Sequence, residues 1–357
     1  MRILLDCRRL RPAGPAADKT RLLFSAAAML SAEDGIEWLI LMDHRYRPGL
    51  FPELPGQVIT RRSLPGRLGW RWWHDRVIRR LARQQHIDMV WLTGGVAARG
   101  MRVPFCVWMP VGGGDARLKP GLERAAAVIC YSERERDRLE GMMPAAEGKI
   151  HVLTPVADES IGVIPEIEKE KIKAEKAKGR EYFLADLTGC GEGEVMNILK
   201  AFSLFKKRQQ SQMRLVFTGT IRAAKRMEER LKTYKYRQDV DWPGDAPDSE
   251  KLALAGAAYA VVLPVEGNGL GVKLLDRWKA GVPVIAAGGG RLEEMAQGAA
   301  LGMAPGDPAS LAAQLMRIYK EEDLRQELTR KGFERLKVYS RENFLGVLRV
   351  ITEIAAC

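Results

Sequence analysis

Residues 261–287 read VVLPVEGNGLGVKLLDRWKAGVPVIAA, and this stretch decides how the rest of the chain is interpreted. The pattern predicts a short apolar strand, a glycine-punctuated loop, a helix over residues 272–280 and a second apolar strand. Gly281 and Pro283 would end the helix, because glycine accepts the left-handed cap and proline cannot continue a helix. A strand, a glycine-rich loop and a helix N-terminus together direct backbone N–H groups and the positive end of the helix dipole toward an anion.

Several side chains in this loop and helix are candidate ligand contacts. Gly267, Gly269 and Gly271 would leave room for a ligand to approach the backbone. Lys273 adds a cation in the first helical turn, and Asp276 follows three residues later, so both can lie on one helical face. A lysine for phosphate and a carboxylate for sugar hydroxyls would suit a nucleotide-sugar. The alternative is an ordinary strand–helix connection that binds nothing.

Length and composition predict a globular protein of two domains. The chain has 357 residues, 46% of them hydrophobic and 29% charged. No apolar run reaches the roughly 18 residues that cross a bilayer, so we expect a cytoplasmic protein. The five cysteines are scattered without a CxxC pair, which predicts reduced, buried thiols. The four histidines lack metal-ligand spacing, so no metal site is expected.

The net charge of +12 favours anionic partners. The most basic segment, residues 61–86, also holds Trp70, Trp72 and Trp73, and its apolar positions keep helical spacing. A helix that combines tryptophan and arginine can lie in a membrane interface beside acidic lipids, here through residues 61–83. The alternative is a solvated helix whose tryptophans pack on their own domain. A nucleic-acid surface is a third possibility, but the sequence contains no nucleic-acid-binding module.

The order of the predicted elements favours an α/β fold. The chain opens with a strand, a helix and a strand, the signature of a parallel sheet. Gly113 and Asp115 lie in a glycine run after a later strand and are candidates for the acceptor side of a cleft. The charged run 166–180 predicts a surface helix in a hinge region, after which the strand–helix alternation repeats. Two Rossmann-like units joined by a hinge make the cleft between them the default ligand site.

Several segments distributed along the chain share one family pattern: MRILLDCRRL, LERAAAVICYSERERDRL, KIHVLTPVAD, EYFLADLTG with ILKAFSLFKK, GVPVIAAGGGRLEEMAQGAALGMAPGDPASLAAQLMRIY and LRQELTRKGFERLKVYSRENF. Through these segments the sequence resembles glycosyltransferase family 4 over essentially the whole chain. The resemblance implies the GT-B fold, with two Rossmann-like domains facing each other across a cleft. It also implies an acceptor domain over residues 1–160, a nucleotide-sugar (donor) domain over residues 161–340, and a terminal helix, residues 341–357, that returns to the first domain.

The resemblance also suggests roles for individual residues. The family's donor helix carries two glutamates separated by seven residues, and these positions fall on Asn268 and Asp276. Asn268 would hold a donor-sugar hydroxyl, and Asp276 the ribose. Lys273 resembles a lysine in one variant of this motif and would contact the diphosphate, as Arg21 would from the first domain. Gly189, in the EYFLADLTG segment, would lie beside the donor.

Other site positions depart from the family. Its Arg-Lys pair, which neutralises the diphosphate, falls on Glu192 and Gly193, and Glu194 follows. Its Gly-x-Gly-Arg loop is replaced by residues 18–21, DKTR, and its His-Asp pair falls on residues 109–110, MP. We therefore carry two hypotheses. The first is a retaining glycosyltransferase that moves a sugar from a nucleotide-sugar to a glycan or lipid-linked acceptor without a metal or other cofactor. The second is a GT-B-fold protein that has lost catalysis and acts as a binding or scaffolding partner.

Overall fold

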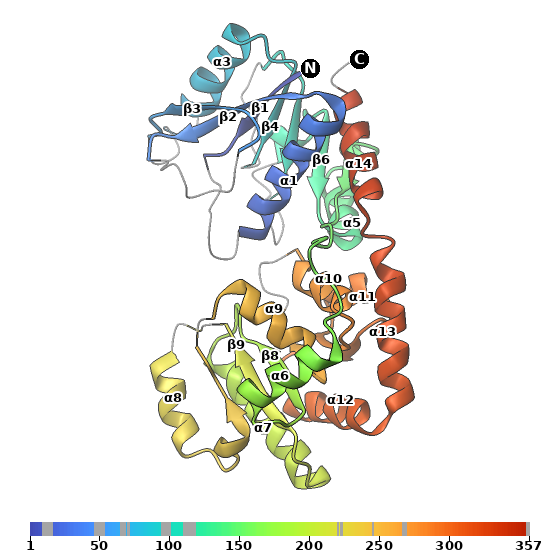
Figure 1. Ribbon diagram of the computed structural model, residues 1–357. Helices are drawn as coiled ribbons and strands as arrows, with labels where there is room; N and C mark the ends of the chain where they lie inside the picture. The colour runs from blue at the N-terminus through green and yellow to red at the C-terminus, as the bar shows by residue number, and fades with distance from the viewer. Residues whose placement is uncertain are drawn as a thin grey trace. The chain divides into compact units, whose positions relative to one another are not determined.

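The computed structural model of the chain describes residues 1–8, 17–45, 54–64, 69, 72–93, 101–109, 119–219, 221, 224–244, 246–265 and 270–354. The chain divides into two compact units (Figure 1). The first comprises Met1–Pro155 and Arg341–Cys357, and the second comprises Val156–Gly267 and Gly271–Ser340. Each unit is built on one sheet, and the described strand pairs are all parallel.

The sheet of the first unit has the order β3-β2-β1-β4-β5-β6-β7. From β1 the chain adds two strands on one side and then returns to the other side of β1, so the direction of winding reverses between β1 and β4. Its strands are β1 (Arg2–Asp6), β2 (Glu37–Asp43), β3 (Gln57–Arg61), β4 (Met89–Leu92), β5 (Phe105–Trp108), β6 (Ala127–Cys130) and β7 (Ile150–Val152).

The central strands of this sheet are completely buried and consist almost only of apolar residues. The sequences MVWL in β4, FCVW in β5 and AVIC in β6 show the pattern of parallel strands that are covered on both faces. The helical elements of the unit are α1 (Ala17–Asp34), η1 (Trp73–Ile78), α3 (Arg79–Gln84), α4 (Lys119–Leu122), α5 (Glu133–Met142), η3 (Pro144–Ala146) and α14 (Arg341–Glu353).

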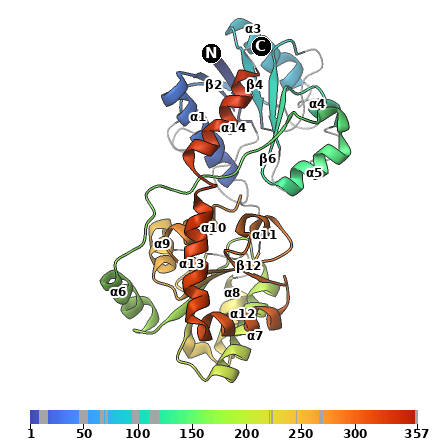
Figure 2. The same ribbon diagram turned by 90° about the vertical axis from the view of Figure 1, so that its right-hand side faces the viewer.

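The last helix, α14, packs against α1 of the first unit (Figure 2). Leu345, Leu348 and Ile351 are buried along one face of α14. Arg349 reinforces the contact, because its Nη2 lies 3.1 Å from Glu33 Oε2 at the end of α1. The C-terminal segment therefore belongs to the same unit as the N-terminus.

The sheet of the second unit has the order β10-β9-β8-β11-β12-β13 and reverses its winding between β8 and β11. Its strands are β8 (Tyr182–Asp186), β9 (Arg214–Thr218), β10 (Val240–Asp241), β11 (Ala260–Leu263), β12 (Val284–Ala287) and β13 (Leu301–Met303). Its helical elements are α6 (Glu166–Ala177), α7 (Glu192–Gln209), α8 (Ala224–Lys232), η4 (Arg237–Asp239), α9 (Asp248–Gly256), α10 (Val272–Lys279), α11 (Arg291–Ala296), α12 (Pro308–Lys320) and α13 (Glu322–Leu336).

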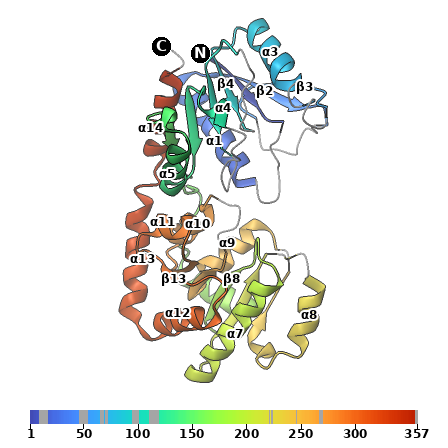
Figure 3. The same cartoon turned by 180° about the vertical axis from the view of Figure 1, so that it is seen from behind.

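Alternate residues of these strands supply two separate cores. Phe183 and Val262 pack with α7 and α12 on one face, and those two helices lie side by side (Figure 3). Leu184 and Val261 pack with α9, α10 and α11 on the other face. Successive side chains of a strand point to opposite faces, so an unbroken apolar strand such as AVVL in β11 serves both cores.

The α/β class and the two Rossmann-like sheets predicted from the sequence are confirmed. The charged run predicted as a surface helix forms α6. Cys7, Cys106, Cys130 and Cys190 are buried free thiols, as expected. In the part of the chain that the structure describes, no helix has the length and apolar character to cross a bilayer.

Candidate active site

At the second sheet, a ligand is expected at the carboxyl ends of β8 and β11. The two strands are neighbours, yet the chain leaves them toward opposite sides of the sheet. In open α/β sheets, ligands bind outside the carboxyl ends of strands at such a reversal. β8 ends in Asp186, and the chain beyond β11 leads into α10. The start of α10 therefore lies at this position, where Lys273 pairs with Asp186.

The N-terminus of α10 begins at Gly271, which the sequence predicted as a donor-site residue. Gly271 has φ +85°, a left-handed conformation that L side chains rarely adopt, and no side chain caps the helix. A Cβ atom at this position would also overlap the side chain of Met295. The start of α10 is therefore set by glycine, and the partial positive charge of its first turn is not neutralised by a capping side chain.

Lys273, in the first turn of α10, forms an ion pair with Asp186. Its Nζ donates to Asp186 Oδ2 at 2.6 Å, and the lysine side chain keeps 39% of its surface exposed. Asp186 is only 6% exposed. Burial opposes ionisation of this carboxyl, but Lys273 and Arg277 outweigh it and hold the pKa of Asp186 below its usual range. Lys273, the predicted phosphate contact, thus lies at the carboxyl end of β8 and is paired there with a carboxylate.

Arg277 is a second cation at the same place. It lies one turn after Lys273 on α10 and is 4% exposed, with Nη2 3.7 Å from Asp186 Oδ2. Its Nε and Nη1 atoms are buried and have no hydrogen-bond partner among the described residues. Sequence reasoning missed both Arg277 and Asp186. The i, i+4 spacing of Lys273 and Arg277 was the available signal, because residues so spaced share a helical face.

The two glutamates at the start of α7, Glu192 and Glu194, have local partners. Glu192 Oε1 lies 2.9 Å from Arg226 Nε on α8. Glu194 Oε2 accepts a hydrogen bond of 2.9 Å from Gly191 N and so caps its own helix, α7. Both carboxylates thus have an observed structural role at the start of α7.

The remaining predicted residues fall in several places. Asp276 is half-buried on α10, with its Oδ1 atom buried. Gly189 is exposed in the turn after β8 and has φ +85°. Arg21 is exposed on α1 of the first unit. The other predicted site residues lie outside the described residues: Gly267, Asn268, Gly269, Gly113 and Asp115.

The first unit has its own buried cation where the winding of its sheet reverses. Lys19 of α1 is 5% exposed. Its Nζ donates to the carbonyl oxygens of Thr93, at 3.1 Å, of Trp108, at 3.0 Å, and of Met109, at 2.8 Å. Burial lowers the pKa of the Lys19 ammonium to about 7, against the opposing effects of Glu135 and Cys106. The segment that replaces the family's glycine loop therefore joins α1 to the ends of β4 and β5.

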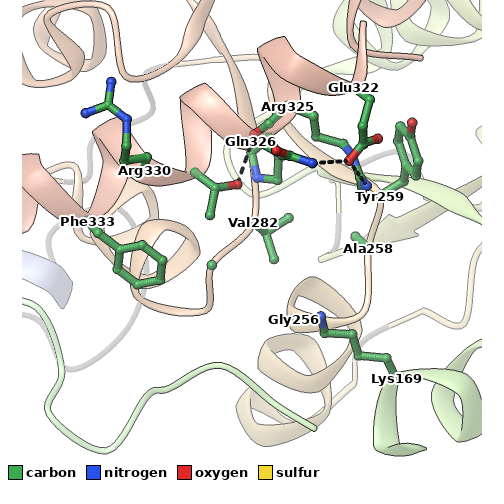
Figure 4. Close-up of a pocket in the computed structure, with 13 residues that line it drawn as sticks. Lys169, Gly256, Ala258, Tyr259, Val282, Glu322, Arg325, Gln326, Arg330 and Phe333 are labelled. Carbon is green, nitrogen blue, oxygen red and sulfur yellow. Dashed lines mark hydrogen bonds and ion pairs between the residues drawn. The ribbon is translucent and has the colours of Figure 1, made fainter. Parts of the chain in front are cut away.

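A pocket of about 470 Å³ lies at the amino ends of strands of the second sheet, because its lining residues Tyr259 and Pro283 directly precede β11 and β12. Figure 4 shows Phe333 toward one end and Tyr259 toward the other, with Val282 between them. The Arg325 guanidinium lies 4.4 Å from the centroid of the Tyr259 ring and pairs with Glu322 at 2.7 Å. This pocket is distinct from the site beside Asp186. The pocket lies at the amino ends of the strands, whereas Asp186 lies at the carboxyl end of β8.

Comparison with known proteins gives the following relationships. Residues 168–335 match the family model of the group 1 glycosyl transferases. Over 104 residues, 29% of this chain and 27% of the relative, the sequence is 29% identical to O-antigen chain mannosyltransferase B of Escherichia coli. The alignment therefore spans about a quarter of that enzyme's length.

Two solved structures show the same fold over nearly the whole chain. A glycosyltransferase from Rickettsia africae ESF-5 has a TM-score of 0.77 at 15% identity, covering 99% of this chain and 98% of the other. Anabaena Alr3699/HepE, solved in complex with UDP-glucose, has a TM-score of 0.70 at 15% identity, covering 100% and 99%. The fold of this protein is accordingly that of the GT-B glycosyltransferases.

Proposed function

We propose that this protein is a retaining glycosyltransferase that moves a sugar from a nucleotide-sugar to a glycan or lipid-linked acceptor. The observation that carries the proposal is the cationic start of α10, where Lys273 lies at the carboxyl end of β8. This cation falls inside the region that matches the group 1 glycosyl transferases. A protein of the same fold binds UDP-glucose, which supports a nucleotide-sugar as the donor. The similarity to an O-antigen chain mannosyltransferase supports a saccharide as the acceptor.

In this proposal the second unit binds the donor. Lys273, with backbone N–H groups of the loop from Gly267 to Gly271 and with Gly189 nearby, would contact the diphosphate. Asp276 would bind ribose hydroxyls, and Asn268 a hydroxyl of the donor sugar. Charge develops on the diphosphate as its bond to the sugar breaks, and fixed cations and amide donors stabilise that charge without reorganising.

The first unit would bind the acceptor, with Gly113 and Asp115 on the acceptor side and Arg21 contributing positive charge. In a retaining transfer, the acceptor oxygen forms its bond to the anomeric carbon on the face from which the diphosphate departs. A donor phosphate oxygen would take the acceptor proton, so the step needs no pair of acid and nucleophile carboxylates. We also propose that no metal ion takes part, and turnover in the presence of EDTA tests this point.

A thermal-shift screen followed by turnover tests the proposal. Nucleoside diphosphates and their sugars should raise the melting temperature, because a ligand that binds the native state stabilises it. Donors that bind should then be assayed for sugar transfer to lipid-linked and free saccharides, with the anomeric configuration of the product determined by NMR. Inversion of the anomeric configuration would contradict the retaining mechanism. The absence of both binding and turnover across the panel would contradict the proposal that the protein is an enzyme.

The second candidate function is a catalytically impaired GT-B-fold protein that acts as a binding or scaffolding partner. It is favoured by the replacement of the family's cationic pair by Glu192 and Gly193, and by the engagement of Glu192 with Arg226. A scaffold of this kind would bind no nucleotide in the screen above. Turnover of any donor would exclude it.

We further propose peripheral membrane contact through residues 61–83. Trp72, at 40% exposure, and the exposed Arg76, Arg80 and Arg83 follow helical spacing on the outer side of η1 and α3. Trp73 does not share this face, because it is fully buried and its Nε1 donates to Asp6. Cosedimentation with anionic and neutral vesicles and with oligonucleotides, at moderate salt, separates acidic lipid from nucleic acid as the partner.

A further inference from the structure

The buried charges Asp186 and Arg277 have no part in the roles assigned above. We propose that Lys273 and Arg277 together form the cation pair that binds the donor diphosphate, and that Asp186 holds both cations until the anion arrives and then competes with it. This inference rests on the proposed function, because it takes the diphosphate of a nucleotide-sugar as the anion. It adds a second binding cation and a counter-ion that resemblance to the family does not predict.

The two oxygens of Asp186 have different partners. Oδ1 accepts a hydrogen bond of 3.0 Å from Thr188 N, which fixes the carboxylate to the loop after β8. Oδ2 lies 2.6 Å from Lys273 Nζ and 3.7 Å from Arg277 Nη2. The carboxylate is thus anchored through Oδ1 and presents Oδ2 to both cations, and an incoming phosphate oxygen would compete for the same N–H groups.

The two cations differ in their freedom to move. The Lys273 side chain is 39% exposed, so it can turn from the carboxylate toward an anion on the solvent side. Arg277 is 4% exposed and fixed in place. Side chains of a helix point back toward its N-terminus, so the guanidinium of Arg277 extends toward the turn that contains Lys273. A ligand at the start of α10 would thus meet one adaptable cation and one fixed cation.

Arg277 also has unused hydrogen-bonding capacity. Its buried Nε and Nη1 atoms have no acceptor in the part of the chain that the structure describes. Buried polar groups are normally paired, and a guanidinium matches phosphate oxygens with two parallel hydrogen bonds. An anion that reaches this guanidinium would supply the missing acceptors. These unused hydrogen-bond donors distinguish Arg277 from an arginine whose role is limited to a structural ion pair.

The arrangement also accounts for the altered loop after β8. The family supplies its cations from positions that here are Glu192 and Gly193, and Glu192 is engaged by Arg226. Lys273 and Arg277 would supply the two positive charges from α10 instead, on the other side of the same crevice. The site would then offer the diphosphate two cations, although they come from different positions of the chain.

Calorimetry with inorganic pyrophosphate and with UDP as probes tests the inference. Arg277→Met should weaken binding of both probes at least tenfold, whereas Lys232→Met, on the exposed surface of α8, should leave it unchanged. Asp186→Asn should lower the melting temperature without ligand, because two cations lose their counter-ion. The same variant should bind pyrophosphate several-fold more tightly and show a larger ligand-induced rise in melting temperature than the wild type.

Wild-type affinity in a folded Arg277→Met variant would overturn the inference. Should that variant fail to fold, Asp186→Asn decides, and unchanged or weaker pyrophosphate binding would count against competition. The proposed function fails separately. If pyrophosphate binds as described but no nucleotide-sugar binds or turns over, the result supports the anion site and contradicts the proposed transferase function. If UDP binds and neither variant alters its affinity, the transferase stands and this inference does not.

Discussion

At the scale of single residues, the first strand of each sheet ends in a buried aspartate. Asp6 ends β1 and accepts the indole N–H of Trp73 at 3.0 Å, whereas Asp186 ends β8 and accepts from Lys273 at 2.6 Å. Both carboxylates lie where the winding of their sheet reverses. The indole binds its aspartate within the core, while Lys273 is partly exposed and can exchange its partner. We therefore expect the proposed diphosphate to bind at the second unit.

Replacing Lys273 by alanine should weaken nucleotide binding at least tenfold, which corresponds to about 1.4 kcal/mol. The reason is the loss of the partly exposed cation at the start of α10, beside an aspartate that then repels phosphate. Titration calorimetry with UDP measures the effect. Lys232→Ala serves as the matched control, since it removes an exposed lysine from a different helix. Equal affinities for the wild type and the Lys273 variant would remove this residue from the site.

Lys19 should make the stability of the first unit depend on pH. The pKa of its ammonium is about 7 in the folded protein, against an unperturbed value of 10.5, so burial of the charge costs stability at and below pH 7. Between these values the unfolded chain binds more protons, and stability should rise by up to about 1.4 kcal/mol per pH unit. Urea unfolding from pH 7 to 9, compared with Lys19→Met, isolates this contribution. The free energy of unfolding of the wild type should rise with pH relative to that of the variant, and a difference that stays constant would contradict the assignment.

At the scale of elements, α10 is held in place by α13. Gly332 of α13 packs directly on the indole of Trp278, which is 1% exposed and donates its Nε1 hydrogen to Ala299 O at 3.2 Å. A Cβ atom at Gly332 would lie 2.6 Å from Trp278 Cδ1. The glycine therefore permits the close approach of two helices, and through it fixes the helix that carries Lys273 and Arg277.

Gly332→Ala should destabilise the second unit by about 1–3 kcal/mol, because the methyl group overpacks a fixed indole. Gly346→Ala is the matched change in α14, where a Cβ atom meets open space. That variant should instead gain about 0.5–1 kcal/mol, since alanine favours a helix interior over glycine. Scanning calorimetry of both variants measures the two shifts. Shifts of the same sign would show that contact with Trp278 does not decide the outcome.

Strands that are buried on both faces are the easiest to predict from the sequence. Strands such as AVVL in β11 and YFLAD in β8 are apolar runs because helices cover both sides. The missed strands lack this pattern: β3 is a half-exposed QVITR at the edge, β10 has two residues, and β13 contains a glycine. Edge strands have fewer neighbours, so their side chains are less constrained and their sequences less distinctive.

The candidate site was predictable only in part, for a related reason. Lys273 was found because it lies in the first turn of a helix that follows a glycine loop. Its partner Asp186 precedes it by 87 positions. The two residues meet because β8 and β11 are neighbours in the sheet. The order of strands in a sheet cannot be predicted from a local sequence pattern. Arg277 was not predicted because an arginine at that spacing is also typical of the exposed surface of a helix.

At the scale of the whole molecule, the chain ends in the unit where it begins. Leu348 of α14 is fully buried against the first unit, while Val350, two residues further on, is 47% exposed. Leu348→Ala should destabilise the first unit by about 2–5 kcal/mol, the usual cost of removing a buried leucine side chain. Val350→Ala should change stability by less than about 0.5 kcal/mol. Denaturant unfolding followed by the near-UV signal of the tryptophans measures both, and similar losses would contradict the packing of α14.

The bonding of Lys19 has a consequence for acceptor chemistry. An ammonium has three hydrogens to give. Here each points to a main-chain oxygen, at Thr93, Trp108 and Met109. The lysine thus has no donor left for a guest molecule, and it serves to anchor α1 on the two strands that it contacts. We therefore expect that Lys19 donates no hydrogen bond to an acceptor, if the first unit binds one as proposed.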